Sequence, residues 1–126
     1  MVENTDRAIA KACQITNTEL VDYTVAPIFM KGKEKGAHEW MIEFEQEPSD
    51  ISRFEGEVDR ILKALNSDYE TKRIGNINID FPKFNYLKPK SFEEWLKKKG
   101  KLGGQHKVPR LMNDRSIIED LIAAKE

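Results

Sequence analysis

A short basic loop near the end of this 126-residue sequence carries its strongest chemical signal. Residues 100–110 combine three glycines with two lysines, one arginine, one histidine and one glutamine. Glycine permits positive φ and a close approach of the backbone to a ligand, and the cations can bind phosphate or carboxylate oxygens. The loop lacks the Lys-Ser/Thr ending of an ATPase P-loop. The composition therefore indicates either an anion-binding loop or a solvated basic turn.

The other reactive side chains form no recognisable catalytic or metal site. Cys13 is the single cysteine, so it cannot form an internal disulfide, and its alanine-rich helical surroundings predict a buried thiol. His38 and His106 are the two histidines, and with one cysteine they give no zinc-binding spacing. No nucleophile elbow or Ser-His-Asp arrangement is visible in the sequence. We therefore expect no metal bound by this chain.

Composition and charge exclude several classes of protein. The 21 Lys and Arg residues almost balance the 22 Asp and Glu residues, so no general attraction to nucleic acid or to an anionic membrane is expected. The lysines at 97–99 and 101 are typical of a solvated helix end. No apolar run approaches the ~20 residues that span a bilayer, and the acidic, polar N-terminus is unlike a signal peptide. These features predict a cytoplasmic protein without nucleic-acid or membrane partners.

The hydrophobic pattern predicts the elements that must position the loop. Amphipathic stripes with capping residues predict helices at about residues 5–13, 51–65, 68–74 and 92–99, and a last helix that begins at Asn113 or Asp114. Alternating residues predict strands at 20–25, 38–45, 76–81 and 83–88, and the glycines at 32 and 36 in the connection favour a hairpin between the first two. Helices and strands mix without a regular βαβ order, so the predicted class is α+β, with a small mixed or antiparallel sheet of about four strands flanked by helices. The length fits one domain, residues 1–126.

Two groups of polar residues in these elements could act in a site or in helix capping. Glu39, Glu43 and Glu45 share one face of the second predicted strand. Three acids on one face could suggest a metal or an acid/base pair, but an alternating strand more simply turns such a face to solvent. Ser91 is predicted to cap the fourth helix, with Glu94 at the capping-box position.

Three stretches, at residues 36–44, 65–73 and 100–111, resemble the C-terminal domain of a known family in both order and spacing. The family is the auxin-responsive promoter family of acyl-acid amido synthetases, within the adenylate-forming superfamily. The most specific piece is the Gln-X-Lys-X-Pro-Arg pattern at residues 105–110. The Leu-Gly-Gly-Gln lead-in is closer to the bacterial branch than to the plant branch. The resemblance covers nearly the whole chain from about Asp6.

The resemblance implies an enzyme function that this chain would share with a larger domain. Such enzymes use ATP and magnesium to convert a small carboxylic acid into an acyl-adenylate, which an amino acid then attacks to form an amide. A large N-terminal domain holds the nucleotide and the acyl acid, and a small C-terminal domain closes over it. The chain would then be this cap, with its N-terminal domain as its partner and absent from the sequence. Alone it would be inactive, and we expect no cofactor bound to it.

The same resemblance assigns roles within the basic loop. Lys107 matches the mobile lysine of the cap, whose charge would meet the α-phosphate and the leaving pyrophosphate. Gly103 and Gly104 would let the loop approach the nucleotide, with Gln105 and Arg110 as supports.

Outside the loop, Tyr69 and Arg73 match the family pattern and are interpreted as fold determinants, while His106 receives no role.

Two alternatives stay open on the sequence. One is a stand-alone α+β interaction module that binds an anionic ligand or partner through the basic glycine-rich loop. It predicts a self-contained pocket and affinity in the isolated chain. The other is a cap from a thioester-forming branch of the superfamily, which would normally carry a different lysine-bearing C-terminal motif. The sequence names neither the acyl acid nor the amino acid.

Overall fold

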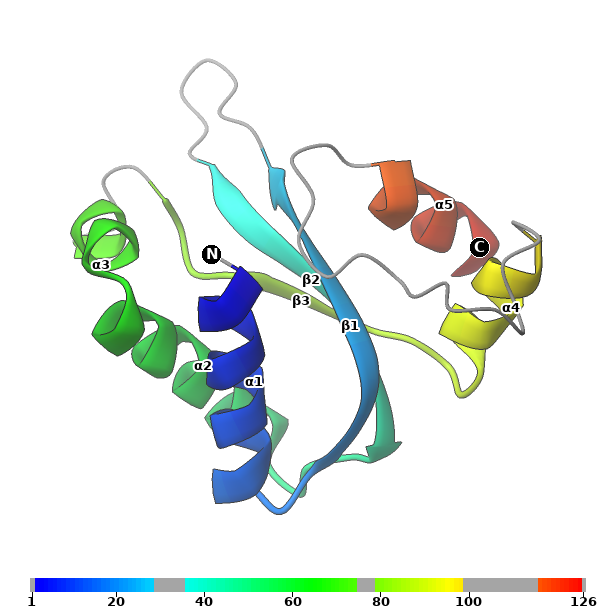
Figure 1. Cartoon of the computed structure of the whole chain (residues 1–126), viewed down its shortest axis with the longest axis horizontal. Coiled ribbons are helices and arrows are strands. Elements are labelled where there is room, and N and C mark those ends of the chain that lie inside the picture. Colours follow the sequence, from blue (N-terminus) through cyan, green and yellow to red (C-terminus); the bar gives the residue numbers. More distant parts are fainter. Residues whose placement is uncertain (1, 29–35, 75–78, 99–115, 126) are drawn as a thin grey trace.

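The computed structural model describes residues 2–28, 36–74, 79–98 and 116–125. In chain order the elements are α1 (Val2–Ile15), β1 (Glu19–Ile28), β2 (Ala37–Gln46), α2 (Ile51–Leu65), α3 (Ser67–Arg73), β3 (Lys83–Tyr86), α4 (Ser91–Lys98) and α5 (Ser116–Lys125). The strands form one sheet in the order β1-β2-β3 (Figure 1). None of these described helices is long and apolar enough to cross a membrane.

The sheet is mixed, which confirms the predicted α+β class. β1 and β2 pair antiparallel as the predicted hairpin, with Tyr23 opposite Ile42, and β2 pairs parallel with β3. The described sheet has three strands rather than about four. Part of the strand predicted at 76–81 lies outside the described residues, and Ile79 makes only an isolated parallel bridge to Gly36. Pro82 has no N–H to donate, which separates this bridge from β3.

The helix boundaries follow from local capping. The Asp50 carboxylate accepts a hydrogen bond from the Arg53 amide at 3.1 Å and begins α2, which has the predicted bounds. The Asn66 side chain accepts a hydrogen bond from the Tyr69 amide at 3.1 Å and begins α3. Both bonds satisfy amides that have no partner inside their own helix.

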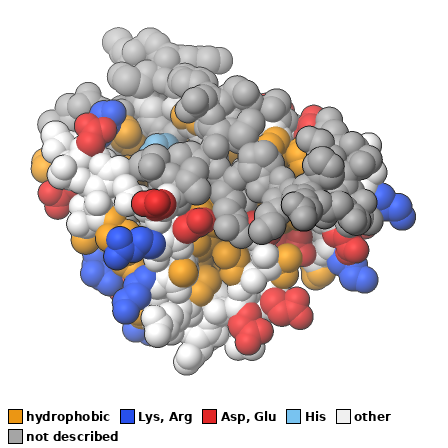
Figure 2. All heavy atoms as spheres, in the orientation of Figure 1, with side chains coloured by type: hydrophobic (Ala, Val, Ile, Leu, Met, Phe, Trp, Pro, Cys, Tyr) orange, Lys and Arg blue, Asp and Glu red, His pale blue; other side chains and the backbone are white. Residues whose placement is uncertain are grey.

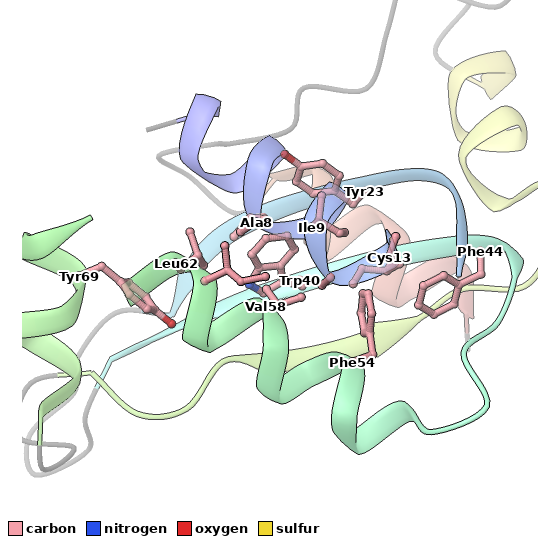
Figure 3. Packing of buried hydrophobic residues seen from close by; sticks show 14 residues of the cluster. Ala8, Ile9, Cys13, Tyr23, Trp40, Phe44, Phe54, Val58, Leu62 and Tyr69 are labelled. Carbon is pink, nitrogen blue, oxygen red and sulfur yellow. The ribbon is translucent and has the colours of Figure 1, made fainter. Parts of the chain in front are cut away.

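The main hydrophobic core lies between one face of the sheet and the pair α1 and α2 (Figures 1 and 3). Trp40 is fully buried at its centre and stacks between Tyr23, at 5.3 Å between ring centroids, and Phe84, at 5.9 Å. The apolar faces of α1 and α2 pack in the same core as these rings. Their buried residues are Ala8, Ile9, Ala12, Cys13, Phe54, Val58, Ile61 and Leu62.

A second hydrophobic cluster lies on the opposite face of the sheet, against α4 and α5 (Figure 1). Its buried members are Ala26, Met41, Phe92, Ile117, Ile118 and Leu121. Ile122 of α5 is partly buried and packs against this cluster. β2 is therefore covered on both faces.

This second layer overturns the prediction for the acidic face of β2. Glu45 is exposed as expected, but Glu39 and Glu43 are buried, at 1% and 4% exposed. The prediction was wrong because α4 and α5 cover the face that the alternation assigned to solvent. On the outer surface, acidic and basic side chains are interspersed with apolar ones over the described part of the face in Figure 2.

Candidate functional site

The predicted anion-binding loop lies between the two helices of the second layer. Its five predicted site residues, Gly103, Gly104, Gln105, Lys107 and Arg110, lie outside the described residues. The roles assigned to them therefore stay predictions. α4 ends at Lys98, and α5 begins at Ser116. What the structure describes is how these two flanking helices are held.

The N-terminus of α4 is held by a buried carboxylate from β2. Glu43 accepts a hydrogen bond from the Lys90 amide at 2.7 Å on Oε2 and one from the Phe92 amide at 3.0 Å on Oε1. A carboxylate at a helix N-terminus meets both free N–H groups and the positive end of the helix dipole. The predicted cap was wrong: Ser91 lies within the helix, and its hydroxyl donates to the Lys88 carbonyl at 2.6 Å.

The second buried acid of β2 binds the neighbouring strand. Glu39 accepts a hydrogen bond from Asn85 Nδ2 at 2.8 Å, and its Oε2 lies 3.5 Å from Lys83 Nζ. Both donors belong to β3. Glu39 and Glu43 are thus engaged in holding the fold, and the acid/base interpretation has no support in their geometry. Across the described ranges, no three His, Cys, Asp or Glu side chains group so as to hold a metal ion.

A cavity of about 580 Å³ lies between α4 and α5. Leu87, Trp95 and Leu121 give it apolar walls, and Lys98 and Asp120 add charge at its margin. Trp95 Nε1 lies 3.4 Å from Asp120 Oδ2, which links the two helices across the cavity. The cavity therefore lies beside Lys98, the last residue of α4 before the predicted loop.

A buried ion pair joins α2 to α3. Arg73 donates to Asp59 from Nε at 2.9 Å and from Nη2 at 2.7 Å, and the Tyr69 hydroxyl donates to Asp59 Oδ1 at 2.6 Å. Burial acts to raise the pKa of Asp59, but the hydrogen bonds from Arg73 and Tyr69 outweigh it, so the pKa is lowered. The guanidinium also lies over the ring of Phe81, at 5.6 Å. These contacts confirm Tyr69 and Arg73 as fold determinants.

His38 lies beside this ion pair without taking part in it. Its ring stacks on Tyr69 at 5.4 Å between centroids, in a small cavity of about 320 Å³ that Lys72 and Asp68 also line. Its Nδ1 is buried and has no hydrogen-bond partner within the described part of the chain. Burial, and then the charge of Lys72, lower the pKa of His38, so the ring is neutral at neutral pH.

Cys13 takes no part in any site. The thiol packs in the main core, and burial raises its pKa to about 11. A thiol with such a pKa is protonated at neutral pH and therefore a poor nucleophile. The predicted structural role of Cys13 is confirmed.

The comparison with protein families identifies the domain. Residues 3–116 match the family model described as the GH3 family C-terminal domain. The chain belongs to this family. The match confirms the resemblance drawn from residues 36–44, 65–73 and 100–111, and it includes the whole segment between α4 and α5. In this GH3 domain, then, α4 and the predicted loop lie within the matched residues, and the match ends at Ser116, the first residue of α5.

Solved structures resemble the fold of this GH3 domain. One is titled GH3.15 acyl acid amido synthetase, with a TM-score of 0.74 and 20% identity over 95% of this chain and 23% of that chain. Another is titled AtGH3.15 acyl acid amido synthetase in complex with 2,4-DB, with a TM-score of 0.73, 18% identity and the same two coverages. At these identities the likeness shows the fold, and this chain spans less than a quarter of either protein. No curated protein matches the sequence.

Sequence reasoning missed Glu43 and Asp59 as the residues that organise this GH3 domain. A signal for Glu43 was present in Met41, which lies between Glu39 and Glu43 on the supposed solvent face. A large apolar side chain there indicates that the face is covered. For Asp59, no signal in the sequence separated it from an ordinary solvated acid beside an apolar helical stripe.

Proposed function

We propose that this domain is the mobile C-terminal cap of an ATP-dependent acyl-acid amido synthetase, which adenylates a carboxylic acid and conjugates it to an amino acid. The observation that carries the proposal is the family match over residues 3–116, because it includes the Gln-X-Lys-X-Pro-Arg pattern. The share of the solved synthetases that the chain spans, 23%, fits one small domain of a larger enzyme. The chain alone is then inactive.

The described acids indicate how ATP and magnesium would be divided between the two domains. Magnesium in nucleotide sites is usually held by one or two carboxylates with substrate phosphates. Glu39 and Glu43, the acids buried beside the second layer, have their oxygens committed to Asn85 and to the amides of α4. We therefore expect neither acid to hold magnesium. By the family resemblance, we assign magnesium, the acyl acid and most nucleotide contacts to the large domain. ATP supplies the adenylyl group that activates the carboxylate.

In this proposal the chain supplies a positive charge to the nucleotide and closes over the large domain. Lys107 brings a flexible positive charge to the α-phosphate as negative charge builds on the leaving pyrophosphate. Gly103 and Gly104 allow the backbone to come close, and Gln105 and Arg110 support the loop. Closure of the cap also excludes water from an adenylate that water would otherwise hydrolyse.

Lys107→Ala tests this role in a full-length synthetase that carries the domain. Exchange of pyrophosphate into ATP, dependent on the acyl acid, should slow by ~10²-fold or more, as expected for removal of a transition-state charge contact. Lys101→Ala is the matched control, because it removes a lysine from the same loop but outside the Gln-X-Lys-X-Pro-Arg pattern. Near-normal exchange in Lys107→Ala would remove this residue from the mechanism.

Two simpler measurements test the cap proposal against the stand-alone module. The reading frame upstream of Met1 should extend by the length of a large nucleotide-binding domain. Calorimetric titration of the 126-residue chain with ATP and magnesium should show no tight binding. A natural start at Met1 together with tight anion binding would instead support the stand-alone module.

A further inference from the structure

We propose that Glu43 is a positioning residue for the cap, whose buried carboxylate sets the direction of α4 and thereby the placement of the segment that carries Lys107. This inference rests on the proposed function for the role of Lys107. The anchoring of α4 by Glu43 can be tested separately from that function.

Both oxygens of Glu43 are used to hold α4. The side chain is 4% exposed, and each oxygen accepts one backbone N–H, from Lys90 at 2.7 Å and from Phe92 at 3.0 Å. No Lys or Arg pairs with Glu43 in the described part of the chain. A buried carboxylate requires compensation, and here the amides and the dipole of α4 provide it. Two bonds to two different oxygens fix the direction of the helix as well as its distance.

α4 depends on such an anchor because it is short. It has eight residues, and Phe92 is its buried residue. An isolated helix of this length is unstable in water, so its orientation is set by tertiary contacts. Lys90, just before the helix, has a left-handed backbone with φ of 70°, a conformation that is strained for lysine. The Glu43 bond to the Lys90 amide holds this turn in place.

The anchored end of α4 determines where its other end points. Phe92 and the Glu43 bonds both lie in its first turn, whereas Lys98 at its end is exposed. The cavity of about 580 Å³ is lined by residues of α4 from Ser91 to Lys98. Release of the first turn would shift Lys98 at the end of α4, the last described residue before the segment that carries Lys107.

Glu39 offers a matched control for any substitution of Glu43. It lies four residues earlier on the same face of β2, is 1% exposed, and binds β3 through Asn85 and Lys83. Glutamine has nearly the size of glutamate, but its amide NH₂ cannot accept a bond from a backbone N–H. Glu43→Gln therefore loses one of the two anchoring bonds, while Glu39→Gln perturbs a buried acid on the same strand without removing the anchor.

Amide hydrogen exchange measured by NMR on the 126-residue chain tests the anchor by itself. Glu43→Gln should speed exchange at the Lys90 amide, the Phe92 amide or both by ~10-fold or more, because one bond is lost and the remaining acceptor is uncharged. Amides of α1 and α2 should exchange at unchanged rates. Glu39→Gln should leave the Lys90 and Phe92 amides unchanged. Equal exchange at both amides in wild type and Glu43→Gln would overturn the proposal.

Adenylation kinetics in a full-length synthetase test the positioning role. Glu43→Gln should lower kcat by ~10-fold with KM for the acyl acid nearly constant, because a contact made only in the transition state is misplaced. Glu39→Gln should keep kcat near wild type. In a Lys107→Ala background, Glu43→Gln should have no further effect, since interacting positions are not additive. A full tenfold loss in that background would show that Glu43 acts independently of Lys107 and would overturn the inference.

These outcomes separate the inference from the proposed function. Normal adenylation in Lys107→Ala would contradict the proposed role of Lys107, whatever Glu43 does. A large loss in Lys107→Ala with wild-type kcat in Glu43→Gln would leave the proposed function intact and contradict only the positioning role.

Discussion

The two faces of the sheet are built in different ways. Fourteen buried residues form the cluster between the sheet and α1 and α2 (Figure 3). The rings of Tyr23, Trp40 and the partly buried Phe84 form a stack. Against α4 and α5, six apolar residues of the described ranges are buried, and two carboxylates lie on the same face. On this second face, Glu39 and Glu43 accept directed hydrogen bonds beside the apolar cluster.

The difference shows which kind of contact stabilises a layer and which kind orients a helix within it. Apolar burial is roughly proportional to area and has no direction, so it favours a compact layer without fixing one orientation. Hydrogen bonds to a carboxylate depend on angle and distance, so they fix how a helix is aimed. In this domain the flanking helices of the predicted loop lie in the second layer. The bonds of Glu43 thus fix the orientation of α4 on the second face.

The largest expected effect tests the first face. Trp40→Ala should lower the free energy of unfolding by about 4 kcal/mol, in the usual range for removal of a buried aromatic side chain. Trp40 is fully buried, and its Nε1 has no hydrogen-bond partner within the described residues, so the loss is one of packing alone. Urea unfolding monitored by circular dichroism measures it.

Leu121 on the second face is the matched comparison for Trp40. It is 3% exposed and belongs to the smaller cluster. Leu121→Ala should cost about 2 kcal/mol, at the low end for a buried leucine, because the site borders a cavity and can relax. Equal losses in the two variants would break the contrast between the faces.

The next effect tests whether charge also matters on the side of α1 and α2. Arg73→Met should lower the free energy of unfolding by about 3 kcal/mol, because it leaves the buried Asp59 carboxylate without its main partner. Lys72→Met is the control, since its pair with Asp68 is exposed, and such pairs contribute about 0.3–0.5 kcal/mol. Thermal unfolding of both variants measures the difference. An Arg73→Met protein as stable as Lys72→Met would mean that the ion pair contributes nothing.

The smallest effect is the dependence of stability on pH at His38. The folded pKa of His38 is lowered by burial and by Lys72, below the value of about 6.5 for an unfolded chain. The unfolded state therefore takes up the proton first as pH falls, so stability is full above about 6.5 and decreases below it. Denaturant unfolding between pH 7.5 and 5 should show this slope, and His38→Gln should flatten it. Parallel curves for the two proteins would contradict a buried neutral ring.

The elements of the fold could be predicted where local pattern decides them. α2 has its predicted bounds because its apolar stripe and the Asp50 cap act within one helix. The β1–β2 hairpin followed from two alternating runs joined by a glycine-containing connection. Of the strand predicted at 76–81, residues 76–78 lie outside the described residues, and Ile79 forms only an isolated bridge to Gly36.

The candidate site was predictable as a motif but not as an arrangement. The Gln-X-Lys-X-Pro-Arg pattern lies within the residues matched to the family, so its family was readable from types and spacing. The anchoring of α4 by Glu43 joins residues 47 and 49 positions apart in the chain. No local pattern reports a bond over that distance, so Ser91 was the natural but wrong choice of cap.

By itself, the sequence determined the helices, the hairpin, the α+β class and the family, because each depends on neighbouring residues or on a short motif. Only the tertiary structure decided that β2 is covered on both faces and that Glu39 and Glu43 are buried. The physical reason is that alternation in a strand states which side chains share a face. Whether that face meets water or a second layer depends on where distant helices pack.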